Sequence, residues 1–278
     1  MRQLSGGVGQ GKPARLTADQ PSIASVTPTL CALLGVPVPS TCQARPLAEL
    51  AGRRVQRCLV YCPDAIGKVA VQRLANDFQR VRECAPLAIE LRSPLPTVTP
   101  VCFATMFTGT GPETHGIRKY EKPVVRQPTL FDALAAAGRR VAIVAVADSS
   151  VDTIFRERPI DYWSEPYDAD VTTKTNELLS SDGADVIVVY HQEYDDVMHK
   201  TAPYSDSAVA ALRRHVSSFV LLVEAANEAW SAHDRAVVFA PDHGVHLDGE
   251  TGHGTHGSDL PDDVEVVHFY GFAAARTV

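Results

Sequence analysis

Short runs of consecutive apolar residues alternate along the chain with segments in which apolar residues recur every three or four positions. The continuous runs are typical of buried strands, and they lie at 57–62, 140–146, 185–190, 235–240 and 264–269. The periodic segments predict helices at 71–81, 128–137, 172–181 and 206–230, with Asp206 as the cap of the last one. Strands that are apolar throughout and alternate with helices favour a mostly parallel sheet with helices on both faces. The pattern predicts a single α/β domain over residues 21–278.

The first 20 residues lack this pattern. They are rich in Gly and Gln, and we expect them to form a flexible N-terminus. Gly7, Gly9 and Gly11 have a spacing that suggests a nucleotide-binding loop, but no strand pattern precedes them and no helix pattern follows. A nucleotide-binding loop is therefore not predicted.

Acidic residues and histidines flank the predicted strands, and in such a sheet ligands bind beyond the carboxyl ends of the strands. The residues are Asp64 after 57–62, Asp195 and His199 after 185–190, Asp242 and His243 after 235–240, and His253 and His256 before 264–269. Each one alone could be a helix cap, a turn residue or a solvated loop histidine. Together, carboxylates and imidazoles at one edge favour a site for zinc, or for manganese where oxygen ligands dominate.

A further candidate is Thr99, which precedes a predicted helix at 101–107. A hydroxyl in this position lies where backbone N–H groups and the helix dipole attract an anion. The alternative is an ordinary N-cap. Thr99 becomes a candidate nucleophile only if a metal or a base lowers its pKa.

The composition excludes several classes of protein. Of the 278 residues, 45% are hydrophobic and 21% charged, which excludes general disorder. No apolar run approaches the roughly 18 residues of a membrane span, so no membrane partner is expected. A net charge of −7 without a basic cluster argues against a nucleic-acid polymer. A small anionic substrate stays compatible, because a bound metal would dominate the local field.

A cytoplasmic location is expected from two features. The start of the chain lacks the apolar stretch of a secretory signal. The six cysteines have no CxxC spacing and indicate reduced thiols: Cys31, Cys42, Cys58, Cys62, Cys84 and Cys102.

Four segments in order resemble the alkaline phosphatase superfamily, in particular its type I phosphodiesterase and nucleotide pyrophosphatase branch. TVTPVCFATMFTGTGPETHGI (97–117) is similar to the nucleophile segment of that branch, with Thr99 at the nucleophile position. YHQEYDDVMHKTAP (190–203), APDHG (240–244) and GTHGSD (254–259) resemble its later motifs. The resemblance covers residues 57–272 and implies an alkaline phosphatase-like α/β fold.

The resemblance also implies a chemistry: hydrolysis of a small phosphoric ester, by a phosphatase or phosphodiesterase, through a phosphothreonine at Thr99. Two divalent ions, preferably Zn²⁺ with Mn²⁺ as the alternative, would be held by the ligand-type residues that match the family. One ion would be held by Asp195, His199 and His256, and the other by Asp64, Asp242, His243 and the Thr99 oxygen. The motif favours His256 over His253.

The sequence departs from the branch at several positions. Gln192 replaces a Glu, and Tyr194 and Met198 replace a Pro and a Gly. Tyr120 stands where the branch has an Asn that donates to a phosphoryl oxygen.

Tyr120 with its neighbours Lys119 and Lys122 forms a candidate substrate-binding group. A bulky phenol should narrow the space beside phosphorus, and the lysines could supply charge to a doubly negative monoester. This favours monoesters over diesters. In the alternative interpretation, Tyr120 packs against the sheet and the two lysines are solvated.

Other functions remain open at this stage. A phosphotransferase or mutase shares the covalent intermediate, although 278 residues leave little room for the large inserted domain of the mutases. A catalytically inactive metal- or phosphate-binding module would not need Thr99. The formylglycine signature of sulfatases is absent from the sequence, and a homo-oligomer is left open.

The segment PSIASVTPTLCALLGVPVPS (21–40) has two interpretations. It resembles an element found near the C-terminus of other superfamily members, which suggests a permuted order. It also has the pattern of a plain amphipathic helix, with Leu30, Leu33 and Leu34 facing the core and Gly35 as its end.

Overall fold

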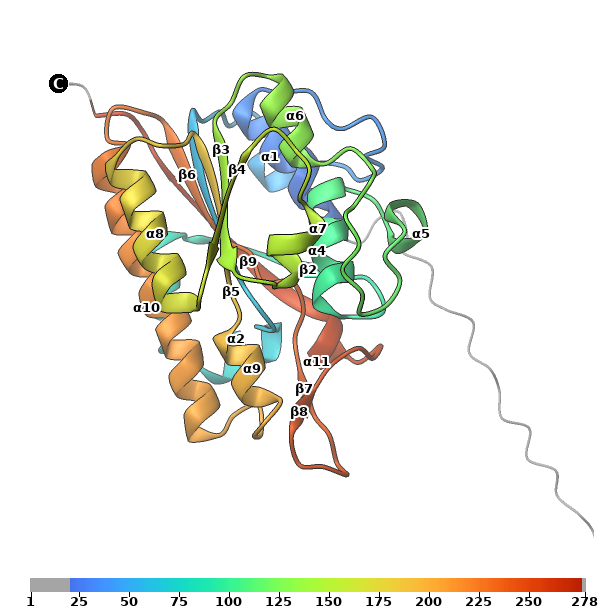
Figure 1. The fold of residues 1–278 in the computed structure, drawn as a ribbon. Coiled ribbons are helices and arrows are strands. Elements are labelled where there is room, and N and C mark those ends of the chain that lie inside the picture. Colours follow the sequence, from blue (N-terminus) through green and yellow to red (C-terminus); the bar gives the residue numbers. More distant parts are fainter. Residues whose placement is uncertain (1–20, 277–278) are drawn as a thin grey trace, which may run out of the picture.

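A computed structural model describes residues 21–276, and its centre is a seven-stranded sheet with the strand order β2-β9-β6-β1-β5-β3-β4 (Figure 1). The strands are β1 (Arg57–Pro63), β2 (Leu87–Arg92), β3 (Val141–Val146), β4 (Asp161–Glu165), β5 (Val186–His191), β6 (Arg235–Phe239) and β9 (Glu265–Ala273). β9 pairs antiparallel with β6 and β2, and the other pairs are parallel. The predicted mostly parallel α/β sheet is confirmed.

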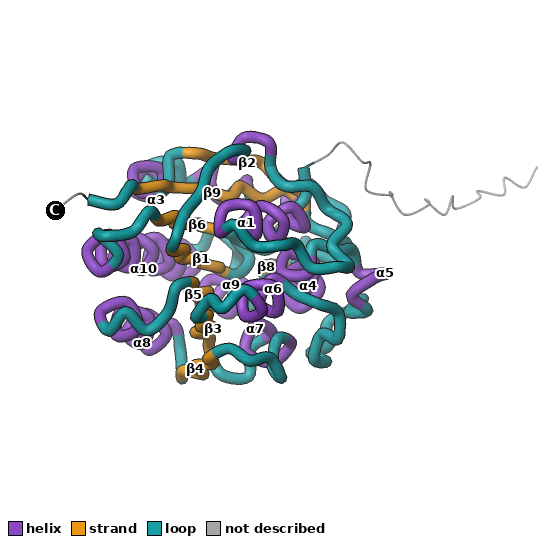
Figure 2. Tube along the Cα trace, turned by 90° about the horizontal axis from the view of Figure 1, so that it is seen from above, coloured by secondary structure: helices purple, strands orange, loops and turns teal. Residues whose placement is uncertain are grey.

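Helices cover both faces of this sheet, and Figure 2 shows them on opposite sides of the row of strands. One side holds α2 (Lys68–Arg73), α3 (Gln79–Cys84), α8 (Asp168–Ser180) and α10 (Asp206–Ala229). The other holds α1 (Val26–Leu34), α4 (Thr99–Thr108), α6 (Leu130–Ala136) and α7 (Ser150–Ile154). Alternate β1 residues belong to different cores, Leu59 and Tyr61 to the first and Val60 to the second. This alternation explains why β1 is apolar at every position.

Shorter elements complete the described chain. They are the 3₁₀ turns η1 (Ile23–Ser25) and η2 (Ala48–Leu50), the short helices α5 (Pro112–His115), α9 (Glu193–Met198) and α11 (Pro261–Val264), and the hairpin of β7 (His246–Leu247) and β8 (Gly254–Thr255). In Figure 1, α9, α11 and the β7–β8 hairpin lie at the same end of the large sheet.

Several predicted helix boundaries are wrong. The helix expected at 71–81 is two helices, because the chain turns at Asn76 and Asp77, whose side chains favour turns over helix interiors. α8 begins four residues before the predicted Thr172. The cap of α10 is the Ser205 side chain, which accepts from Ala208 N, and Asp206 lies in the first turn.

The segment 21–40 packs against the helix that begins at Thr99. Leu30, Leu33 and Leu34 are buried, and Gly35 ends α1 with φ +69°, so the predicted amphipathic helix is confirmed. Thr27 Oγ1 donates to Met106 O of α4 at 2.7 Å. The permuted order stays a prediction, and the flexible N-terminus predicted for residues 1–20 lies outside the described residues.

Two expectations from composition can be compared with the structure. Among residues 21–276, no helix is long and apolar enough to span a membrane. All six cysteines lie in this range, and none of them forms a disulfide there.

Candidate functional site

The loops that follow β1, β5 and β6 meet the loop that precedes β9 at one end of the sheet. β9 runs opposite to its neighbours, so its beginning lies beside the carboxyl ends of the parallel strands. Asp64 directly follows β1, and Asp242 follows β6 by three residues. Asp195 lies on α9 and His199 ends it, so their i,i+4 spacing puts both on one helix face.

The structure gathers the six Asp and His residues among the seven predicted ligands into two groups of three. In the first group, Asp195 Oδ1 lies 3.5 Å from both His199 Nε2 and His256 Nε2, and these two nitrogens are 3.1 Å apart. In the second group, His243 Nε2 lies 3.4 Å from Asp64 Oδ1 and 3.3 Å from Asp242 Oδ2. The groups are adjacent, because the His243 and His256 ring centroids are 4.1 Å apart.

These separations suit metal coordination. Ligand atoms bound to a tetrahedral zinc at about 2.0–2.1 Å lie roughly 3.3 Å from one another. The five separations of 3.1–3.5 Å in the two groups scatter around that value.

The hydrogen bonds of the three histidines leave each Nε2 as a bare lone pair. The Nδ1–H of His199, His243 and His256 each faces a backbone carbonyl, at 3.1 Å from Gly254 O, 3.1 Å from Gly244 O and 2.7 Å from Thr97 O. Each carbonyl can only accept, so Nδ1 carries the proton and Nε2 is free to bind a metal. The Nε2 lone pairs of His199 and His256 then face each other and repel, and a cation between them would remove this repulsion.

Buried polar atoms without a hydrogen-bond partner gather at these groups. Among the described residues, such atoms include Asp64 Oδ1, Asp195 Oδ1, Asp242 Oδ2 and His243 Nε2. Buried polar atoms are normally satisfied, and the unsatisfied ones require an explanation. A metal ion in each group would bind all four, so the residues present fit two metal ions.

Charge in the second group also favours a cation. Burial raises the pKa of Asp64 to about 8, and the nearby Asp195 charge adds to the rise. Burial raises the pKa of Asp242 well above its usual range, with repulsion from Asp64 contributing, and burial lowers the pKa of His243 to about 3. Two buried carboxylates beside a neutral imidazole need a positive charge to remain ionised.

In the first group a proton on His256 Nε2 supplies the positive charge when no metal is bound, and it competes with a metal ion for the same lone pair. Burial alone would raise the pKa of Asp195, but the hydrogen bond and charge of His256 outweigh it, and the pKa is lowered. Burial alone would lower the pKa of His256, but Asp195 outweighs it in turn and the pKa is raised.

Thr99 is the first residue of α4, and its side chain points to the second group. Val98 is the N-cap, so the interpretation of Thr99 as an ordinary N-cap is wrong. Thr99 is 4% exposed, and its hydroxyl donates to Asp64 Oδ2 at 3.3 Å. The same Asp64 oxygen accepts from the Tyr190 hydroxyl. The hydroxyl therefore lies at the helix N-terminus and beside a candidate metal ligand.

A cavity of about 140 Å³ adjoins Thr99 and Asp64, and its lining includes Tyr120, Lys122 and Gln192. Tyr120 is 62% exposed, so the expectation that it packs against the sheet is wrong. Lys122 Nζ lies 5.6 Å from the Tyr120 ring centroid and donates to Asp148 O at 2.8 Å. Lys119 forms an ion pair with Glu121 at 3.5 Å instead.

The other departures from the family motif are packing residues. Tyr194 is fully buried, and its hydroxyl donates to Pro203 O. Met198 is also fully buried and packs against Gly254, where a Cβ would overlap the Met198 sulfur. These two substitutions leave the Asp195 to His199 geometry in place.

Sequence reasoning missed two parts of this region. One is Tyr190, which ends an apolar run and gave no separate signal. The other is a buried group of Asp168, His191 and His215 on the opposite side of β5. His215 interrupts the apolar stripe of a long helix, which is a signal that could have marked it.

Comparisons with known proteins identify the family of the chain. The sequence model of the family "Type I phosphodiesterase / nucleotide pyrophosphatase" matches residues 63–248, about two thirds of the chain. No curated protein sequence matches this chain significantly.

Solved structures show a similar fold at low identity. Phosphonoacetate hydrolase from Sinorhizobium meliloti 1021, in complex with phosphonoacetate, is 18% identical with a TM-score of 0.52, over 72% of this chain and 60% of that one. Murine ectonucleotide pyrophosphatase/phosphodiesterase 5 is 18% identical with a TM-score of 0.57, over 70% and 59%. The human protein of the same name is 14% identical with a TM-score of 0.58, over 78% and 88%. The chain thus spans about 60% of the bacterial and murine structures.

Proposed function

The chain belongs to the type I phosphodiesterase/nucleotide pyrophosphatase family, and from this premise we propose that it is a metal-dependent hydrolase of phosphoric esters that uses Thr99 as its nucleophile. The observation that carries the proposal is the placement of Thr99 beside two groups whose ligand atoms have metal-type spacing and include four buried atoms without a hydrogen-bond partner. A hydroxyl nucleophile and sites for cations are the two requirements of phosphoryl transfer through a covalent intermediate.

Asp195, His199 and His256 would hold one ion, and Asp64, Asp242 and His243 would hold the other with the Thr99 oxygen. Two bound divalent ions, zinc by the donor set, would supply charge neutralisation for the phosphoryl oxygens and acidify hydroxyl groups at the site.

Residues of the chain orient the nucleophilic hydroxyl of Thr99. Asp64 accepts the Thr99 proton in a hydrogen bond, which aims the hydroxyl, and the Tyr190 hydroxyl holds Asp64 in place. Burial raises the pKa of Tyr190 well above its usual value, so this phenol stays a donor. The Thr99 oxygen gives up its proton, for which Asp64 is the hydrogen-bond acceptor, and forms a bond to phosphorus while the ester bond breaks. The leaving alkoxide takes up a proton and departs as the alcohol. Water then cleaves the phosphothreonine and regenerates the hydroxyl.

The substrate that we propose is a small phosphoric ester and not a nucleic-acid polymer. The cavity of about 140 Å³ and the net charge of −7 support this choice. A cytoplasmic location and zinc as the native metal are parts of the same proposal.

The test compares metal-depleted and zinc- or manganese-loaded protein on an aryl phosphate monoester, the matching diester and an aryl phosphonate. We expect turnover of at least one ester by the loaded protein, loss of turnover after chelation, and its return on adding metal.

The same assay separates the alternatives. Loaded protein that binds two ions but hydrolyses none of these compounds would be a binding module. A product ratio that follows the concentration of an added acceptor alcohol would indicate a phosphotransferase.

Tyr120 supports a preference for monoesters within this proposal. Its ring lies at the cavity beside Lys122, which could offer charge to a doubly negative phosphate. Tyr120→Phe is expected to lower kcat/KM for the aryl monoester by about tenfold, the value of one hydrogen bond. Tyr120→Asn is expected to shift the ratio of diester to monoester kcat/KM upward.

The control for this prediction is Tyr162→Phe, which removes a hydroxyl that donates to Phe155 O away from the cavity. It should leave both activities as they are. If Tyr120→Phe has no more effect than this control, the Tyr120 hydroxyl has no role at phosphorus, and the preference for monoesters loses its basis.

A further inference from the structure

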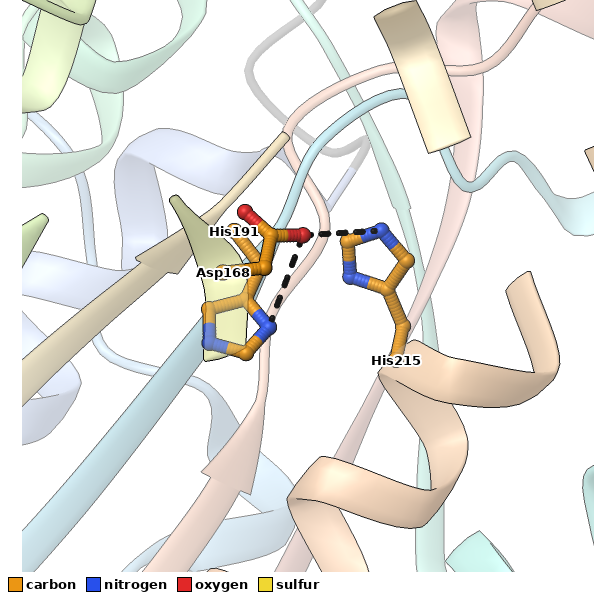
Figure 3. Close-up of side chains that lie close together, drawn as sticks. All are labelled: Asp168, His191 and His215. Carbon is orange, nitrogen blue, oxygen red and sulfur yellow. Dashed lines mark ion pairs between the residues drawn. The ribbon is translucent and has the colours of Figure 1, made fainter. Parts of the chain in front are cut away.

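A third group of ligand-type side chains lies on the α8 and α10 side of β5 (Figure 3). Asp168 begins α8, His191 ends β5 and His215 lies within α10. All three are buried. Asp168 Oδ2 lies 3.8 Å from His191 Nδ1 and 3.7 Å from His215 Nε2. By residue type and proximity, this group resembles the two candidate metal groups.

The hydrogen bonds of this third group distinguish it from the two candidate metal groups, because each of its inward-facing atoms already accepts a hydrogen bond. Asp168 Oδ1 accepts from Gln192 N and Asp168 Oδ2 from Glu193 N, both at 3.0 Å. His215 Nε2 accepts from Tyr194 N at 3.0 Å. The two candidate metal groups instead contain buried atoms that no described residue satisfies.

The remaining ring nitrogens are also satisfied. His215 accepts at Nε2, so its Nδ1–H faces the Tyr61 hydroxyl at 3.4 Å, and that hydroxyl donates to His191 Nδ1 at 2.8 Å. His191 Nε2–H then donates to Thr172 Oγ1 at 3.2 Å. Burial lowers the pKa of His215 to about 3 and that of His191 well below its usual value, which keeps both rings neutral. No ring-nitrogen lone pair in the group is left for an ion, and both Asp168 carboxylate oxygens already accept hydrogen bonds.

The three backbone N–H groups that the group binds are consecutive and belong to the start of α9. Gln192 is the N-cap of α9, and its own side chain makes no capping bond. The first N–H groups of a helix have no partner within it, and a helix of six residues is unstable without tertiary support. Asp168 and His215 supply the missing acceptors from α8 and α10.

We propose that Asp168 and His215 are positioning residues for the metal site, because they fix the first turn of α9 and thereby place Asp195 and His199. The inference rests on the proposed function, since it assumes that Asp195 and His199 hold an ion. Asp195 is the residue after Tyr194, and His199 is one helical turn further along. The Arg214–Glu193 ion pair, with N–O distances of 2.7 and 2.8 Å, ties the same turn to α10.

The two metal groups should respond differently to loss of this support. Asp195 and His199 depend on α9, whereas Asp64, Asp242 and His243 follow β1 and β6. Loss of a partner that orients metal ligands typically weakens metal binding by about 10- to 100-fold. The affinity should fall for only one of the two ions, the one that Asp195 and His199 would hold.

The experiment titrates the full chain with Zn²⁺ in competition with a chromophoric chelator, which resolves a tighter and a weaker ion. The variants are Asp168→Ala and His215→Phe, which remove the acceptors, and His215→Gln, whose side-chain oxygen reaches near the place of Nε2. Asp132→Ala is the matched control, because Asp132 caps α6 with the same kind of bond to Thr129 N at 2.7 Å.

We expect Asp168→Ala and His215→Phe each to lower the affinity for one ion by about 10- to 100-fold and to leave the affinity for the other unchanged. His215→Gln should regain most of the lost affinity, and Asp132→Ala should change neither ion. Co²⁺-substituted protein should show the same pattern as a changed absorption spectrum at one site.

Several results would overturn the inference. Equal weakening of both ions would mean general destabilisation, and no weakening would mean that α9 needs no such support. His215→Gln that behaves like His215→Phe would exclude the acceptor role. Wild-type protein with three ions, one lost in His215→Phe, would make the group a metal site. Wild-type protein that binds no ion would overturn the proposed function as well.

Discussion

Thr99→Ala is expected to reduce turnover by about 10³-fold or more while the protein keeps its fold and its metal ions. Removing a covalent nucleophile costs several kcal/mol of transition-state stabilisation, and ground-state contacts cannot replace it. Asp64, Asp242 and His243 remain to hold the second ion when the Thr99 oxygen is lost, and the first group does not include Thr99. Metal content should therefore change little.

The measurement is kcat/KM for the best aryl ester, together with elemental analysis and the mass of acid-quenched protein. Wild-type protein quenched during turnover should carry one phosphoryl group, and Thr99→Ala should carry none. Thr99→Ser keeps a hydroxyl and should retain measurable activity.

Thr108→Ala is the matched control, because Thr108 is another buried threonine of α4 whose hydroxyl donates to Ala104 O. Turnover of Thr99→Ala within about tenfold of wild type would show that Thr99 is not the nucleophile.

The second large effect is expected at His256. We predict that the purified protein carries close to two metal ions, and that His256→Ala loses one of them together with most of its activity. His256 Nε2 lies 3.1 Å from His199 Nε2 and 3.5 Å from Asp195 Oδ1. Its loss leaves two of three ligand side chains, and loss of the ion removes several kcal/mol of charge stabilisation.

His253→Ala is the natural control, because this histidine is three residues away in the same loop. His253 is exposed, and the first ligand group does not include it. It should keep both ions and full activity. Elemental analysis of both variants decides the matter, and loss of metal from His253→Ala with retention in His256→Ala would reverse the assignment.

The local sequence pattern was sufficient to locate the central strands and the edge of the sheet at which the candidate site forms. A central strand is buried on both faces, so β1, β3, β5 and β6 are apolar at almost every position. Parallel strands end at one edge, so acidic residues and histidines directly after them had to lie near one another.

The edge strands could not be recognised from the sequence in the same way. β2 and β4 are partly exposed, and they have no continuous apolar run to mark them. The break between α2 and α3 was hidden for the opposite reason. Phe78 lies in the break and is still buried, so the helical spacing of apolar residues continues across a turn.

Residue type and spacing alone did not choose between neighbouring residues, although the family motif favoured His256 over His253. Spacing alone treats His253 and His256 alike, and likewise Lys119 and Lys122, but only one of each pair faces the site or its cavity. Which atoms are free to bind a metal depends on hydrogen bonds to distant carbonyls, such as that of His256 Nδ1 to Thr97 O.

The group of Asp168, His191 and His215 was the least accessible to sequence reasoning. Its members come from three elements, and no local pattern connects a buried histidine in α10 to the start of α9. Residue types alone would have made it a third metal site. The tertiary hydrogen bonds decide otherwise, because they occupy the ring-nitrogen lone pairs that would face an ion and bond to both Asp168 oxygens.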